Sequence, residues 1–191
     1  MRKARVERKT AETEIMVEVN LDGRGESSVM TGVLFLDHVV RSLATHSLID
    51  VKVEAKGDLA HHVVEDVAIT LGEALDQALG DRRGIYRFGH AFIPMDEALA
   101  YASVDLVKRP YSVVRLRIKD GRVEDVAADD VNHFMQSLVS SMKATCHIRV
   151  LYGSNDHHKV EAAFKALAVS LRTASGRDER RIEAASSKGV M

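Results

Sequence analysis

The sequence predicts an α+β fold of two duplicated halves, each a β-sheet with helices packed on one face. Two observations support this prediction. Segments in which apolar and polar residues alternate are interspersed with amphipathic helical segments from residue 2 to residue 174. In addition, the pattern His-His-x-x-Glu occurs twice, at residues 61–65 and 157–161, each time at the start of an apolar helical segment.

The first half is expected to span residues 1–85. Alternation predicts strands in four segments: 2–9, 13–21, 27–33 and 49–57. Helical spacing predicts two helices: 36–48 and 61–80. The sequence DGRG at 22–25 indicates a turn, Asp37 is available as an N-terminal cap, and Gly80 ends the second helix.

The second half is expected to span residues 86–175 and to repeat this order. The predicted strands are 85–95, 97–107, 111–118 and 145–153. The predicted helices are 129–144 and 156–174, with a turn at KDGR, residues 119–122. Residues 176–191 form a C-terminal tail that we expect to be loose until a ligand binds it.

The spacing of the histidines supports the duplication. His61 follows the helical His38 by 23 residues, and His157 follows the helical His133 by 24 residues. The flanking sequences also correspond, because HVVRSL, which begins at His38, matches HFMQSL, which begins at His133. We therefore interpret the chain as a repeated strand–helix–strand–helix unit.

Composition excludes several classes of protein. Lys and Arg total 27 and Asp and Glu total 28, so no overall charge favours nucleic acid or an anionic membrane. No segment resembles a signal peptide or a membrane span. The only cysteine, Cys146, cannot form an intramolecular disulfide. We expect a cytoplasmic protein with neither nucleic-acid nor membrane partners.

The repeated motif has the spacing of a metal site. Residues four apart share one face of a helix, whereas adjacent residues point about 100° apart. His61 and Glu65 can therefore bind one ion, while His62 would have to serve a second ion. With the matching residues there are eight candidate ligands: His38, His61, His62, Glu65, His133, His157, His158 and Glu161. Nitrogen and carboxylate ligands without thiolate suit manganese, iron, cobalt or zinc in an open, catalytic site.

We expect the ligands to cross between the halves. One predicted set is His61, Glu65, His133 and His158; the other is His157, Glu161, His38 and His62. A single histidine near a helix end is more often a cap or a surface residue than a ligand. Repetition of the whole pattern favours the metal site over that alternative. His90 and His147 have no counterpart in the repeat and are interpreted as structural, and His46 is left open.

Several stretches resemble the imidazoleglycerol-phosphate dehydratase family over nearly the whole chain. They are RKTAETEI, NLDGRG, TGVLFLDH, EDVAITLGEALDQALG, GIYRFG, PMDEALAYASVDLVKRPY, DHHKVEAAFKAL and SSKGV. The resemblance implies two halves with a ribosomal protein S5 domain 2-like fold. It also implies a shell of 24 subunits with two Mn²⁺ ions per active site between subunits, bound by the same eight ligands.

The resemblance implies a lyase of histidine biosynthesis that dehydrates D-erythro-imidazole glycerol phosphate to imidazole acetol phosphate. Glu12, Glu65 and Glu161 are the expected catalytic carboxylates. Glu12 is our first choice as proton carrier, with water on the metal as the competitor. The expected substrate-binding residues are Glu12, His46, Arg87, Arg109, Lys165, Ser186 and Lys188, so the tail would contribute to the phosphate site.

The sequence departs from the family pattern in two places. The loop KGDLAHH is short and lacks the usual acidic residue before the histidine pair, so a carboxylate orienting His61 or His62 is expected to be missing or supplied from elsewhere. Ser42 replaces a glutamine common near the phosphate. Two other functions fit the ligands: a dinuclear metallohydrolase acting on a small phosphorylated substrate, and a metal-storage or structural assembly protein.

Overall fold

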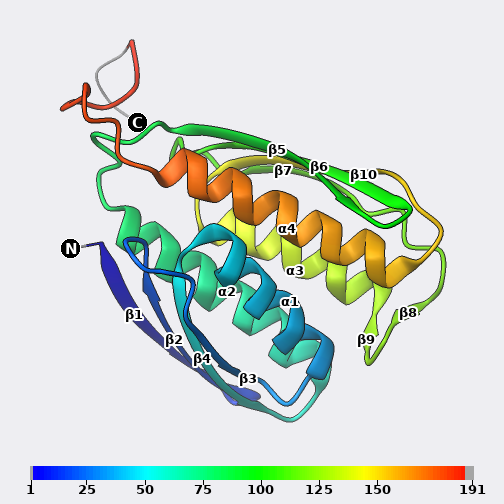
Figure 1. The fold of residues 1–191 in the computed structure, drawn as a ribbon. Helices are drawn as coiled ribbons and strands as arrows, with labels where there is room; N and C mark the ends of the chain where they lie inside the picture. The colour runs from blue at the N-terminus through cyan, green and yellow to red at the C-terminus, as the bar shows by residue number, and fades with distance from the viewer. Residues whose placement is uncertain (1, 188–191) are drawn as a thin grey trace.

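The structure, a computed structural model, describes residues 2–187; it contains two four-stranded sheets with four helices between them and a short two-stranded ribbon (Figure 1). The first sheet has the order β1 (Lys3–Lys9), β2 (Thr13–Asn20), β4 (Asp50–Gly57), β3 (Ser27–Met30). The second has the order β5 (Phe88–Met95), β6 (Ala98–Asp105), β10 (Thr145–Tyr152), β7 (Tyr111–Arg115). The helices are α1 (Leu34–Ser47), α2 (Ala60–Leu79), α3 (Ala128–Ser141) and α4 (Asp156–Ser175).

The two halves share one topology, which confirms the predicted duplicated α+β fold. In each sheet an antiparallel hairpin is followed by an antiparallel third strand and a parallel edge strand. Helices α1 and α2 pack on the first sheet, and α3 and α4 on the second. The halves then meet through their helices, with α1 against α4 and α2 against α3.

Helix α2 shows how the apolar face of a predicted helix is used. Six residues at helical spacing form an apolar stripe on it and are buried: Val64, Val67, Ala68, Leu71, Leu75 and Leu79. The opposite half lies very close to this helix, because a Cβ atom on Gly72 would come within 2.6 Å of the Leu138 carbonyl oxygen on α3. Glycine at this position therefore allows the two halves to pack tightly.

The N-terminus of α1 differs from the prediction. The helix begins at Leu34, so Asp37 is not its cap; Asp37 is buried and accepts hydrogen bonds from Thr31 N (3.0 Å) and Thr31 Oγ1 (2.6 Å). The first amides of the helix, Leu34 N and Phe35 N, instead donate to the carboxylate of Asp125, at 2.7 and 2.9 Å. Asp125 belongs to the second half, so local sequence could not reveal this cap.

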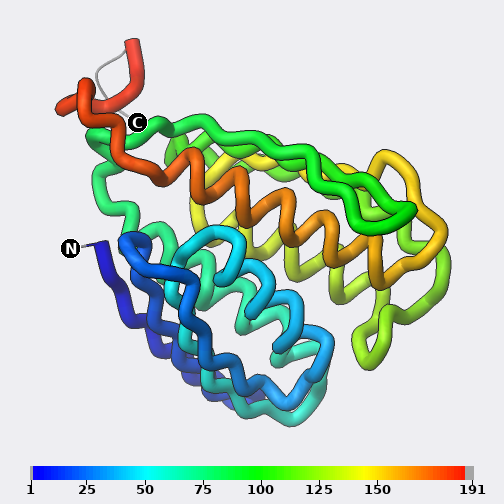
Figure 2. The backbone as a smooth tube through the Cα atoms, viewed as in Figure 1, coloured from blue at the N-terminus to red at the C-terminus, as the bar shows by residue number. Residues whose placement is uncertain are grey.

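Two segments outside the four-stranded sheets and the helices were not predicted correctly. A short two-stranded ribbon, β8 (Arg122–Val123) and β9 (Val126–Ala127), precedes α3 where only a turn was expected. The described part of the tail, 176–187, is not loose: it runs beside residues 83–87 (Figure 2), with β-bridges between Ile85 and Arg177 and between Arg83 and Ala184. The expected boundary at residue 85 falls between α2 and β5 and stays a prediction.

Membrane-spanning helices are not found in residues 2–187, since none of the helices there is both long enough and apolar enough.

Candidate metal centre

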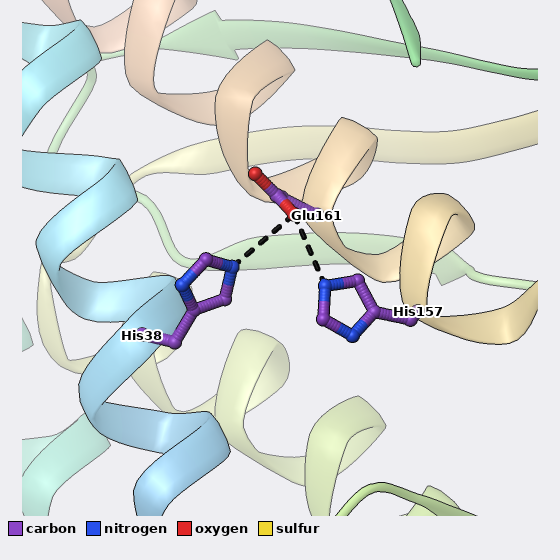
Figure 3. A group of neighbouring side chains, drawn as sticks. All are labelled: His38, His157 and Glu161. Carbon is purple, nitrogen blue, oxygen red and sulfur yellow. Dashed lines mark hydrogen bonds and ion pairs between the residues drawn. The ribbon is translucent and has the colours of Figure 1, made fainter. Parts of the chain in front are cut away.

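Three predicted ligands come together between α1 and α4 (Figure 3). Nε2 of His38 and Nε2 of His157 each lie 3.2 Å from Oε2 of Glu161. One ligand atom from each residue lies within 4.8 Å of the others, a spacing compatible with one shared cation. We call this group the His38 triad. It draws on both halves, as predicted, because α1 belongs to the first half and α4 to the second.

The carboxylate of Glu161 is poised to be a ligand. Its side chain is only 10% exposed, and Lys165 Nζ lies 2.8 Å from Oε1. Burial raises the pKa of this carboxyl, but the hydrogen bonds and charges of Lys165 and His38 outweigh burial and lower the pKa to about 2. Glu161 is therefore ionised at neutral pH, as metal binding requires.

The equivalent group lies between α2 and α3. Nε2 of His133 lies 3.1 Å from Oε1 of Glu65, and Nε2 of His61 lies 4.0 Å from Oε2 of Glu65. We call these residues the His133 triad. It has the same composition as the His38 triad with the roles of the halves exchanged, since the single histidine now comes from the second half.

His62 and His158 were predicted to complete these sets, but their polar contacts are elsewhere. His62 Nδ1 lies 2.7 Å from Asp58 Oδ1 and 3.7 Å from Glu12 Oε2. His158 Nδ1 lies 2.8 Å from Glu97 Oε2. Among the described residues, one chain thus brings together three of the four members of each predicted set.

Each histidine of the two pairs has a carboxylate on Nδ1, a feature that the sequence analysis missed. The pairs are His61–Asp130 (2.6 Å), His62–Asp58 (2.7 Å), His157–Glu124 (3.0 Å) and His158–Glu97 (2.8 Å). Such a partner fixes the ring and leaves Nε2 for an ion. Of the two alternatives expected for His61 and His62, a missing carboxylate is wrong and a carboxylate supplied from elsewhere is confirmed for His61, whose partner Asp130 lies on α3; Asp58, the partner of His62, comes from the short loop itself.

A hollow lies beside the His38 triad. It is lined by Leu34, Phe35, His38, Arg122, Glu124, Asp125 and His157. The Phe35 ring lies 5.1 Å from that of His157, so one wall is aromatic. A larger hollow on the outer face of the first sheet is lined by Lys3, Arg5, Glu18, Lys52 and neighbouring residues and contains none of the predicted ligands. We therefore place the site at the triads.

Two of the predicted substrate residues lie near the His38 triad. Lys165 contacts Glu161 and lies 3.8 Å from the Met95 sulfur. Burial first, and then the charge of Lys165, lower the pKa of His46. The hydroxyl of Ser42, on the same face of α1, is buried without a hydrogen-bond partner among the described residues. These groups form a partly buried polar patch beside the metal ligands.

The other predicted phosphate-binding residues lie at the far end of the second sheet. Arg87 forms a forked ion pair with Asp105, at 2.7 and 3.0 Å, and donates from Nη1 to the Ala185 carbonyl at 2.6 Å. Ser186 follows in the tail, and Arg109 lies on the exposed loop after β6. Arg87 N binds Ala174 O, and about 13 Å of helix separates Ala174 from Lys165. One chain does not join the two groups, and Lys188 lies outside the described residues.

The donor types fit a divalent cation, and among the described residues the His38 triad is the group whose three ligand atoms all lie within 4.8 Å of one another. Each triad offers two imidazole nitrogens and one carboxylate, an N and O set that suits manganese, iron, cobalt or zinc. Three ligands per triad leave further coordination positions for a fourth protein ligand and for substrate. This arrangement resembles catalytic metal sites more than closed structural ones.

Comparisons with known proteins agree on one family. The sequence model described as imidazoleglycerol-phosphate dehydratase matches residues 31–171. The chain is 49% identical over 191 residues to a protein of that name from Clostridium botulinum (strain Okra / Type B1), covering 98% of this chain and 97% of the relative. It is 51% identical over 177 residues to the one from Methanothermobacter thermautotrophicus, covering 91% of each. The crystal structure of the Pyrococcus furiosus enzyme superposes with a TM-score of 0.85 at 40% identity, covering 97% of this chain and all of that one.

Proposed function

The chain belongs to the imidazoleglycerol-phosphate dehydratase family, and we propose that it is a hydro-lyase that converts imidazole glycerol phosphate to imidazole acetol phosphate in histidine biosynthesis. The observation that carries the proposal is the pair of crossed triads with Glu12 beside His62. The reaction removes a hydroxyl from the carbon attached to the imidazole and a proton from the neighbouring carbon.

Two Mn²⁺ ions per active site are the proposed cofactors. The His38 triad would hold one ion and the His133 triad the other, with His62 and His158 of neighbouring subunits as the fourth ligands. The support is geometric: both histidines have Nδ1 held by a carboxylate, an arrangement that presents Nε2 as the ligand atom, and among residues 2–187 Nε2 of His158 has only the exposed Asp96 carboxylate near it, at 3.7 Å. When bound, divalent cations supply Lewis-acid polarisation and a template for the substrate.

A shared site of this kind also implies assembly. If ligands from different subunits meet at one ion, part of the metal-binding free energy becomes subunit-association free energy. We therefore propose a homo-oligomer, with the 24-subunit shell as the expected form.

Glu12 is the proposed proton carrier. Its side chain is 55% exposed, and Oε2 lies 3.7 Å from His62 Nδ1, so the carboxylate is accessible beside a histidine that we propose as a metal ligand. In the proposed reaction it takes the proton from the carbon next to the hydroxyl-bearing one. His46, Lys165, Arg87, Arg109, Ser186 and Lys188 are the proposed contacts to substrate, in which the cationic groups bind the phosphate.

The test is an assay of purified protein with Mn²⁺ and imidazole glycerol phosphate. We expect the enolisable ketone product and no release of inorganic phosphate; phosphate release without ketone would identify a hydrolase instead. Glu12→Gln should abolish turnover without changing bound metal. Glu14→Gln is the matched control, because Glu14 is an exposed neighbour whose ion pair, with Lys9 at 3.5 Å, is directed away from the site. Normal turnover in Glu12→Gln would refute the role of Glu12.

A further inference from the structure

The two halves use a glutamate near the turn of their first hairpin in different ways. The β1–β2 turn lies beside the start of α2 and carries Glu12; the β5–β6 turn lies beside the start of α4 and carries Glu97. Because the halves share one topology, these hairpins occupy equivalent places. A comparison of the two turns therefore shows what each glutamate is able to do.

In the second half the glutamate is structurally occupied. Oε1 of Glu97 accepts hydrogen bonds from Ser154 N and Asn155 N, at 3.0 and 2.7 Å, and Oε2 lies 2.8 Å from His158 Nδ1. The bond to His158, followed by the Asn155 amide, holds the pKa of Glu97 well below its usual range. Glu97 thus fixes its hairpin to the helix start, and its oxygens are committed to that task.

In the first half a different carboxylate anchors the hairpin. Asp66 is 8% exposed, and its oxygens accept hydrogen bonds from Arg8 Nε, at 2.7 Å, and from the Thr13 hydroxyl. Arg8 is on β1 and Thr13 begins β2, so Asp66 binds both strands next to their turn. Thr13 is itself 4% exposed. A buried carboxylate satisfied from two strands fixes their position relative to α2.

The same network fixes the main chain of Glu12. Thr10 Oγ1 lies 3.1 Å from Thr13 Oγ1 and accepts from Glu12 N at 3.1 Å and Thr13 N at 3.0 Å. On the other side, Asp58 N donates to Glu12 O at 3.1 Å. The backbone of Glu12 is therefore held from both sides, while its carboxylate remains 55% exposed.

The sequence shows that this anchor is particular to the first half. Asp66 follows directly after Glu65, whereas the residue after Glu161 in the second copy of the motif is Ala162. The half that carries the exposed Glu12 has the extra buried carboxylate, and the half whose glutamate is the anchor does not.

We propose that Asp66 is a positioning residue for the reaction: through Thr13 it holds the β1–β2 turn on α2, so that the Glu12 carboxylate stays free and correctly placed at the metal centre. This inference rests on the proposed function, because it assumes that Glu12 carries the proton. Asp66 does not itself touch the substrate. Its neighbour Glu65 is a predicted ligand, so Asp66 fixes the hairpin to the same helix, α2, that carries part of the His133 triad.

The test uses the full-length, manganese-loaded protein. Thr13→Val removes the hydroxyl that donates to Asp66 with little change in shape, and Thr13→Ser keeps a donor. Asp66→Asn, which removes the charge of the carboxylate, is the second variant and serves as the test if Thr13→Val fails to fold. Thr173→Val is the matched control, because the exposed Thr173 hydroxyl donates within its own helix, to Val169 O at 3.2 Å, and has no other hydrogen-bond partner among residues 2–187. Each variant is assayed for kcat, KM, Mn²⁺ affinity and amide exchange of residues 8–16.

We expect Thr13→Val to lower kcat about 10- to 100-fold, as for a misplaced catalytic group, and to speed exchange of residues 8–16. KM and Mn²⁺ affinity should stay within about twofold, a pattern typical of a lost transition-state interaction. Thr13→Ser should restore most of kcat. The proposal is overturned if kcat falls no further than in Thr173→Val, or if Mn²⁺ affinity falls by the same factor as kcat. Normal turnover of Glu12→Gln would overturn the role of Glu12, and the exchange data would then still support or overturn the anchoring by Asp66.

Discussion

Replacement of Asp125 by alanine should weaken the fold and the His38 triad together. The Asp125 carboxylate accepts hydrogen bonds from the first two amides of α1, Leu34 N at 2.7 Å and Phe35 N at 2.9 Å. Loss of a capping side chain costs about 0.5–2 kcal/mol, and the interaction of a carboxylate with the helix dipole adds about 0.3–1 kcal/mol. Leu34 is 75% exposed, so water partly replaces the lost bond. We therefore expect a loss of about 1–2 kcal/mol.

The assay is urea unfolding of the metal-free protein, followed by titration with Mn²⁺. His38 is one turn beyond the capped amides, so a frayed first turn must re-form before His38 can bind an ion. The free energy needed to re-form this turn, at most the whole cost of the lost cap, then weakens Mn²⁺ binding at the His38 triad by about tenfold. Asp125→Asn keeps a hydrogen-bond acceptor and should therefore lose less unfolding free energy and less Mn²⁺ affinity than Asp125→Ala. An unchanged unfolding free energy, or equal weakening at the His133 triad, would refute the reasoning.

Two further outcomes are expected. The first concerns acid stability. The pKa of Glu161 is lowered from 4.5 to about 2, so its carboxylate stabilises the metal-free fold above pH 4.5 by up to about 3 kcal/mol. This contribution is lost as the pH falls toward 2. Unfolding of wild type and Glu161→Gln at several pH values should therefore converge in acid, and a difference independent of pH would contradict this. The second concerns assembly: removal of metal by EDTA should yield smaller, inactive particles in size-exclusion chromatography, and a particle of unchanged size would argue against ligands shared between subunits.

Much of the fold could be predicted because the relevant physics is local. The apolar stripe of α2 and the glycine that ends it follow from helical periodicity, and the structure buries that stripe. The start of α1 could not be predicted in this way. Its cap, Asp125, is 91 residues distant from Leu34 in sequence, so the chain near Asp37 contains no sign of it. The tail was misjudged for the same reason, since its partners are residues 83–87.

In the candidate site, too, the features set by local sequence could be predicted and those set by distant residues could not. Spacing on one helix identified His157 with Glu161 and His61 with Glu65, and the repeat identified His38 and His133. The carboxylates that orient the rings were missed because three of the four are remote in sequence from their histidines; Glu97, for example, precedes His158 by 61 residues. Asp58 alone could have been found, because it lies four residues before His62.

The crossing of the triads follows from how the duplicated halves pack. Within one half, α1 and α2 cover the same sheet, yet His38 meets ligands on α4 and His133 meets ligands on α2, because the close helix contacts are between the halves. The tight approach at Gly72 lies on the same pair of helices as Glu65 and His133. Since neither half contains a complete triad, the proposed metal centre requires both halves to be packed together. The two halves present equivalent candidate ligands, and they differ at single residues such as Asp66 against Ala162; this difference accompanies the proposed division in which Glu12 of one half carries the proton while Glu97 of the other is fixed in the scaffold.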